Sequence, residues 1–144
     1  MDKKIYFSGN SNDFKLAEKL CDVLAKDLEP AKTVVVLGKG GGVDKALTPE
    51  AVVYEFGTIV ETDDNVKRYT YSAGQSNADI CGLNFQKREM SRSLELLSGS
   101  FMGRVNIPVN SEYTQQAVLY CAAGFMAAEV NMRDLLKVIN DKIE

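Results

Sequence analysis

The sequence contains no histidine. Histidine is the usual general base near neutral pH and the commonest metal ligand. Its absence excludes a Ser-His-Asp site, a Cys-His site and a histidine-based metal site within this chain. Catalysis would have to use carboxylates, lysine, tyrosine, cysteine or bound Mg²⁺. No base–nucleophile pair is visible, so we expect catalysis to be modest or absent.

Cysteine is scarce, because only Cys21, Cys81 and Cys121 are present and no two of them form a Cys-x-x-Cys pair. An odd number of separated cysteines is typical of reduced thiols in a cytoplasmic protein. The apolar run after residues 1–4 is too short for a secretory signal. Cys21 and Cys121 fall within apolar helix patterns, where a buried small hydrophobic residue is the favoured interpretation.

Long apolar runs and a strong excess of one charge are also missing. The longest weakly polar run, residues 117–128, is too short to span a bilayer. The net charge is −3 and the basic residues are scattered, so the chain carries no nucleic-acid footprint. With 45% apolar residues in a length of 144, we expect one soluble, cytoplasmic domain over residues 1–144, without nucleic-acid or membrane partners.

The first forty residues have the pattern of a β-α-β unit. Residues 4–7 form a short apolar strand, and residues 13–28 form an amphipathic helix that Ser11 or Asn12 caps. Residues 33–37 form a second apolar strand, and residues 33–36 are β-branched without alternation, as expected for a strand covered on both faces.

The rest of the chain predicts a mixed α/β fold. Thr48 and Pro49 predict a short helix over residues 49–54, with a strand over 52–56 as the alternative. Further strands are predicted at residues 58–61, 67–72, 79–89, 93–97 and 105–109, as an antiparallel meander. Helices are predicted at residues 112–129 and 132–143. The predicted fold therefore has a βαβ start, a mixed sheet with an antiparallel-rich middle, and two C-terminal helices packed on the sheet.

Two loops follow the first two strands, at the edge where α/β proteins bind phosphate-bearing ligands. The first loop includes Ser8, Gly9 and Asn10. It lacks the Lys and Ser/Thr of a working P-loop, and Asp13 would repel a phosphate. An ordinary capped turn is therefore the favoured interpretation of this loop.

The second loop is the stronger candidate, and it consists of Gly38, Lys39, Gly40, Gly41 and Gly42. Its glycines permit the close backbone approach of an anion-binding nest, and its lysine adds positive charge. It matches neither G-x-G-x-x-G nor the full Walker pattern. A flexible surface loop is an equal alternative.

A carboxylate cluster follows, made of Glu61, Asp63 and Asp64. Such groups can hold Mg²⁺, which favours oxygen ligands. Adjacent acids in a turn more often remain solvated, and that alternative is favoured here.

Several segments resemble the central, ATP-binding domain of the Mur ligases, the peptidoglycan amino-acid ligases. Residues 60–64, Val-Glu-Thr-Asp-Asp, are similar to that family's strand ending in two acids. Residues 69–74 with 78–80 are similar to its glycine loop and the strand after it, and residues 111–117 are similar to the start of its Ala-rich helix. Residues 5–13 fall where the family keeps Thr-Gly-Thr-x-Gly-Lys-Thr, without the lysine, and Thr114 and Gln116 replace two asparagines. The resemblance implies a shell for ATP and Mg²⁺ rather than an active ligase.

We therefore expect a protein that binds a nucleotide or another phosphate-bearing ligand at the glycine loops. The alternative is a non-catalytic oligomeric or partner-binding module. It is motivated by a stripe of small residues, Ala117, Cys121, Gly124 and Ala128, and by edge-prone middle strands.

Overall fold

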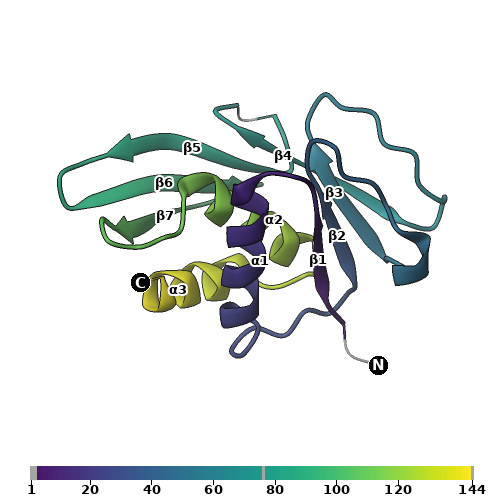
Figure 1. Ribbon diagram of the computed structural model, residues 1–144, viewed down its shortest axis with the longest axis horizontal. Coiled ribbons are helices and arrows are strands. Elements are labelled where there is room, and N and C mark those ends of the chain that lie inside the picture. The colour runs from purple at the N-terminus through teal and green to yellow at the C-terminus, as the bar shows by residue number, and fades with distance from the viewer. Residues whose placement is uncertain (1–2, 76, 144) are drawn as a thin grey trace.

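The computed structural model describes residues 3–75 and 77–143. In these residues seven strands form one sheet whose spatial order is the chain order. The strands are β1 (Ile5–Ser8), β2 (Val34–Leu37), β3 (Ala51–Glu55), β4 (Lys67–Ala73), β5 (Ile80–Lys87), β6 (Ser91–Ser98) and β7 (Phe101–Pro108). The helices are α1 (Asn12–Leu24), α2 (Gln115–Ala127) and α3 (Met132–Lys142), with a 3₁₀ turn η1 (Lys45–Leu47) between β2 and β3. Figure 1 shows the helices together on one face of the sheet.

The predicted mixed α/β fold is confirmed. Neighbouring strands from β1 to β5 run parallel, and β5, β6 and β7 run antiparallel. Both C-terminal helices pack against the sheet, α2 across its middle and α3 against β7. The meander is confined to β5–β7, because β4 pairs in parallel with the strands on both sides of it. None of the described helices is long and apolar enough to cross a membrane.

The β1-α1-β2 unit is present as predicted, and Ser11 caps α1 by accepting a hydrogen bond from the Phe14 amide at 3.3 Å. The helix ends at Leu24, earlier than predicted. Leu28 is still buried, because the turn after α1 brings it onto the same core. The apolar spacing therefore continued beyond the helix that it predicted.

The helix predicted over residues 49–54 is wrong, and the alternative strand is present as β3. Ala51, Val52 and Val53 are fully buried between β2 and β4. Thr48 ends η1 in the left-handed conformation, with φ of 46°, instead of starting a helix. Sheet pairing here outweighed a local helix-start signal.

The strand predicted at residues 58–61 is also wrong. These residues belong to the irregular connection between β3 and β4. They cannot pair with β4, the strand that follows them, because β3 and β5 occupy both of its sides.

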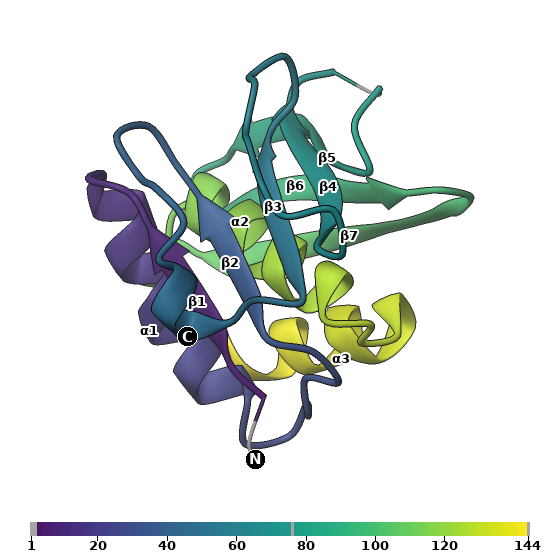
Figure 2. The same cartoon turned by 90° about the vertical axis from the view of Figure 1, so that its right-hand side faces the viewer.

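The two faces of the parallel strands are covered differently. The helices cover one face and enclose the main core. The other face carries a smaller apolar cluster centred on Val35, Leu37 and Val52, which the loops 38–50 and 56–66 cover. Figure 2 looks onto β1, β2 and β3 from this helix-free side.

The small-residue stripe of α2 lies inside the molecule. Its members are buried in the main core, which α1, α2 and the sheet enclose. A Cβ added at Gly124 would lie 2.6 Å from Cγ2 of Ile5, so glycine allows α2 to approach β1 closely. The stripe is thereby engaged in the core.

The free edge of β7 is closed by the side chain of Asn140 on α3. Its Oδ1 accepts a hydrogen bond from the Asn106 amide, and its Nδ2 donates to the Arg104 carbonyl, both at 3.1 Å. The amide thus makes the hydrogen bonds that a neighbouring strand would make. Pro108, at the end of β7, has no N–H to offer a partner.

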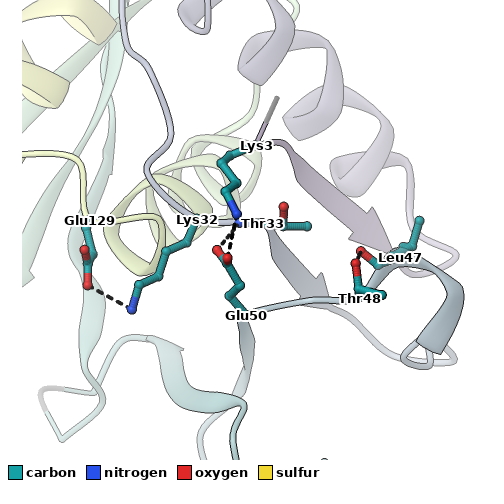
Figure 3. A network of polar contacts seen from close by, with 7 residues as sticks. All are labelled: Lys3, Lys32, Thr33, Leu47, Thr48, Glu50 and Glu129. Carbon is teal, nitrogen blue, oxygen red and sulfur yellow. Dashed lines mark hydrogen bonds and ion pairs between the residues drawn. The ribbon is translucent and has the colours of Figure 1, made fainter. Parts of the chain in front are cut away.

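Glu50 links the amino ends of the parallel strands, as Figure 3 shows. Its carboxylate accepts hydrogen bonds from the Lys3 ammonium at 2.6 Å and from the Thr33 amide at 3.0 Å. Its carbonyl accepts from the Lys67 amide at 3.1 Å. The hydrogen bond from Lys3 is the main reason why the pKa of Glu50 lies below its ordinary value of 4.5.

Candidate functional site

A cleft of about 620 Å³ lies at the carboxyl edge of the parallel strands. It is lined by residues 38–41 of the loop after β2 and by residues 58–60 of the loop after β3. Phe14, Tyr71 and Tyr120 contribute aromatic rings to the lining, together with the half-buried Tyr54. This is the edge at which the sequence predicted a ligand.

The two predicted loops come together at this edge. The Ser8 hydroxyl accepts a hydrogen bond from the Gly42 amide at 3.1 Å and donates to the Gly42 carbonyl at 3.0 Å. Gly41 passes so close that an added Cβ would overlap the Ser8 carbonyl. Asn10 is exposed beside Gly40, whose φ is 81°. Ser8 therefore fastens the second loop to the first.

The second loop uses most of its own amides. Gly38 donates to the Ser8 carbonyl at 2.8 Å, and Gly41 donates to the Gly38 carbonyl at 3.0 Å. With Gly42 bonded to the Ser8 hydroxyl, the hydrogen bonds of the described residues leave only the amides of Lys39 and Gly40 without an acceptor. The predicted nest thus retains two amide donors and one ammonium group.

The first loop does not fit a triphosphate. Ser11 already accepts the hydrogen bond of the Phe14 amide, and the Asp13 carboxylate accepts one from Thr114 Oγ1 at 2.6 Å. The Phe14 ring is buried against the backbone of the two loops, because a Cβ at Gly9 or Gly38 would lie 2.8 or 2.6 Å from it. These contacts support the capped-turn interpretation of this loop.

Strand and helix periodicity in the sequence indicates packing roles for most of the tyrosines and leaves a base-stacking ring among them as the alternative, but it does not indicate which rings line the cleft. Tyr120 meets Phe14 edge-on with ring centroids 4.6 Å apart, and it meets Tyr71 at 5.3 Å. The three rings come from α1, β4 and α2. No local spacing in the sequence could have indicated that they meet.

The two tyrosine hydroxyls in this cluster have different surroundings. Tyr71 donates to the Leu37 carbonyl at 2.7 Å, and burial raises its pKa well above 10. Burial also raises the pKa of Tyr120, with smaller contributions from the carboxylates of Asp13 and Glu55. None of the hydrogen bonds among the described residues involves the Tyr120 hydroxyl. Because Tyr120 is half-buried and lines the cleft, this hydroxyl can meet a ligand.

A larger cavity of about 810 Å³ lies on the helix-free face between the loops 38–50 and 56–66. It shares Leu37, Gly41, Ile59 and Val60 with the cleft, so the two spaces adjoin.

The predicted magnesium ligands lie near this larger cavity. Glu61 and Asp63 line it, and Asp64 is exposed on the same loop. Within residues 3–75 and 77–143, no three His, Cys, Asp or Glu side chains gather closely enough to hold a metal ion. The magnesium site therefore stays a prediction, because the described residues do not bring three such ligands together.

Comparison with known proteins gives a fold and no sequence relative. No protein-family model matches the chain, and no curated protein matches its sequence. Among solved structures, MurF from Acinetobacter baumannii superposes with a TM-score of 0.63 at 12% identity, over 99% of this chain and 46% of that one. A pseudomurein peptide ligase type C from Methanothermus fervidus superposes with a TM-score of 0.62 at 8% identity, over 99% of this chain and 50% of that one.

A third structure is a UDP-N-acetylmuramoyl-L-alanyl-D-glutamate–2,6-diaminopimelate ligase. It superposes with a TM-score of 0.55 at 14% identity, over 77% of this chain and 28% of that one. The chain thus spans half or less of the length of these three proteins. The resemblance to Mur ligases predicted from the sequence is confirmed, and at these identities it concerns the fold alone.

Proposed function

We propose that this chain, with its Mur ligase-like fold, binds a small phosphate-bearing ligand of the nucleotide class in the carboxyl-edge cleft. One observation carries the proposal: two loops about 30 residues apart in the sequence meet at this edge, where one of them lines the cleft with Lys39 and three glycines. Open α/β sheets bind their ligands at such an edge. The volume of about 620 Å³ lies within the usual range for small-molecule sites.

The proposal is one of binding, without a reaction. The chain has no histidine. The first loop has no lysine to bind phosphate, and Asp13, in the first turn of α1, carries a negative charge. The carboxylates of the β3–β4 loop do not form a three-ligand group. Neither a triphosphate seat nor an assembled Mg²⁺ site is therefore part of the proposal.

A thermal-shift screen tests this function. ATP, ADP, AMP, GTP, NAD and sugar nucleotides are added separately, with and without Mg²⁺. A ligand at a hundredfold excess over its Kd should raise the Tm by roughly 5–10 °C. A flat response across the whole panel would refute the proposal.

Substitution of Lys39 locates the site. Lys39→Ala should weaken binding of any phosphate-bearing ligand found in the screen, and Lys39→Asp should weaken it further because it reverses the charge. Lys137→Ala is the matched control, since Lys137 is equally exposed but lies on α3, outside the cleft. Equal affinity for all these proteins would place the ligand elsewhere.

The features that motivated a partner-binding module are engaged within the molecule. The small-residue stripe is buried in the main core, and Asn140 occupies the free edge of β7. We therefore do not advance that alternative as the function.

A further inference from the structure

We infer that the cleft selects its ligand through a planar ring, so that a nucleoside monophosphate binds at least as tightly as the corresponding triphosphate. This inference rests on the proposed function and specifies the class of ligand for the same site. It follows from three properties of the cleft: its few donors, its charge and its aromatic lining.

The glycine loop itself offers few donors to phosphate. The amides of Gly38, Gly41 and Gly42 are bonded within the loops, and Ser11 accepts the bond of the Phe14 amide. Within the loop 38–42 the amides of Lys39 and Gly40 remain, together with the Lys39 ammonium. These groups can satisfy one phosphate group, whereas a P-loop surrounds two or three phosphates with amides and a lysine.

The Phe14 ring also makes two of the loop glycines unsuitable for binding a polyphosphate. It fills the space over Gly9 and Gly38, and it is 4% exposed. Glycines that bind phosphate leave their backbone amides accessible to the ligand. Here the Phe14 ring covers both glycines. The glycines serve ring packing at this point.

The charges near the cleft disfavour a highly charged ligand. Lys39 lines the cleft with a positive charge and Glu55 lines it with a negative one. Tyr120 also lines the cleft, and the nearby Asp13 carboxylate contributes to the raised pKa of its hydroxyl. A triphosphate would bring several negative charges to a place where the protein supplies no excess of positive charge, and repulsion at such short range is substantial.

The lining instead offers rings. Tyr54 and Tyr120 are half-buried and both line the cleft, so part of each ring or hydroxyl remains accessible. Every nucleobase has a π-face that stacks on aromatic side chains. The Tyr120 hydroxyl adds a hydrogen-bonding group that the described residues leave free for the edge of a base.

The test measures the affinities of adenosine, AMP and ATP, and of guanosine, GMP and GTP, by calorimetry with and without Mg²⁺. We expect the monophosphate to bind as tightly as the triphosphate or more tightly, and Mg²⁺ to change the Kd less than twofold. A triphosphate that binds tenfold or more tightly than its monophosphate would overturn the inference while leaving the proposed function standing. Binding by no member of either series would overturn the inference, and the proposed function would fall only if the whole thermal-shift panel also gave a flat response.

Matched tyrosine variants identify the ring contact. Tyr54→Ala should weaken the nucleoside and its phosphates by a similar factor, about tenfold, which is the usual effect of losing one stacking ring. Tyr6→Ala is the control, because Tyr6 packs on the same helix-free apolar cluster but does not line the cleft. Tyr120→Phe keeps the ring and removes only the hydroxyl, so it tests the hydrogen bond with little risk to folding. Unchanged affinity in both Tyr54→Ala and Tyr120→Phe, with ligand still bound, would overturn ring selection.

Discussion

Replacing Gly38 with alanine tests whether the Phe14 ring is wedged between the two loops. The added Cβ would lie 2.6 Å from Cζ of Phe14, 2.8 Å from Cε2 and 3.0 Å from Cε1. Carbon atoms pack best about 3.5–4.0 Å apart, so the ring must move by roughly 1 Å. Tyr120 leaves it little room, because the two ring centroids are already 4.6 Å apart.

The magnitude follows from two opposing terms. Overpacking a core typically costs about 1–3 kcal/mol. The φ of Gly38 is not in the positive region, so alanine also restricts the unfolded chain, a gain of about 0.4–1 kcal/mol. Gly38→Ala should therefore destabilise the protein by roughly 0.5–2 kcal/mol, and the Tm should fall by roughly 2–8 °C.

The decisive result is the coupling between the two positions. Phe14→Ala alone should cost about 3–5 kcal/mol, as truncation of a buried phenylalanine usually does. In that background the methyl group of Gly38→Ala enters vacated space, so the second change should be neutral or slightly stabilising. The double-mutant cycle should then give a favourable interaction energy of about 1–3 kcal/mol.

Urea unfolding of the four proteins, followed by circular dichroism, measures this cycle. Gly42→Ala is the control, because its Cβ would meet nothing within 4 Å and should have the same small effect with or without the Phe14 ring. Phe14→Leu replaces Phe14→Ala if the latter does not fold. Additivity of the Phe14 and Gly38 substitutions within about 0.5 kcal/mol would refute the wedged-ring geometry.

Three further predictions concern stability and association. Tyr71→Phe removes the 2.7 Å hydrogen bond to the buried end of β2 and should cost about 1–3 kcal/mol in urea unfolding; no change in midpoint would contradict that bond. The pKa of Glu50 is lowered below 4.5 by Lys3, so its stabilisation is present above pH 4.5 and is lost as the pH falls through the lower folded pKa. The stability difference between the protein and Glu50→Gln should therefore shrink below pH 4.5, and a difference that stays constant with pH would argue against this ion pair. Asn140→Ala frees the β7 amide and carbonyl to which Asn140 is bonded, so it should increase association in sedimentation at high concentration. Asn140→Gln, with the same amide one carbon further out, should have a smaller effect. An unchanged monomer fraction for Asn140→Ala would contradict the edge-closing role.

Local patterns were sufficient to predict the elements whose apolar residues recur with the spacing of their buried faces. α1 and α3 each bury one apolar stripe, and the N-cap of α3 is Asn131, which accepts hydrogen bonds from the amides of Arg133 and Asp134. β2 is a β-branched run covered on both faces. In these cases the residues that form an element also carry the signal that predicts it, because helical and strand periodicities arise within a few residues.

The edge of the sheet that holds the cleft was predictable for the same reason. Loops that follow parallel strands must meet at the carboxyl edge, so Ser8 and the loop 38–42 could be placed near one another before any contact was known. How many amides remain free could not be predicted, because that depends on the hydrogen bonds between the two loops.

Local patterns therefore predicted the βαβ start, a set of antiparallel strands, the two C-terminal helices and the edge at which the loops lie. Long-range packing makes residues 51–55 a strand, because their burial between β2 and β4 outweighs a helix-start signal. Long-range packing also brings Asp13 to Thr114, which lies 101 residues away, and it gathers rings from four elements around the cleft. Such contacts form between residues distant along the chain, and only the packing of the whole sheet against its helices brings them within reach.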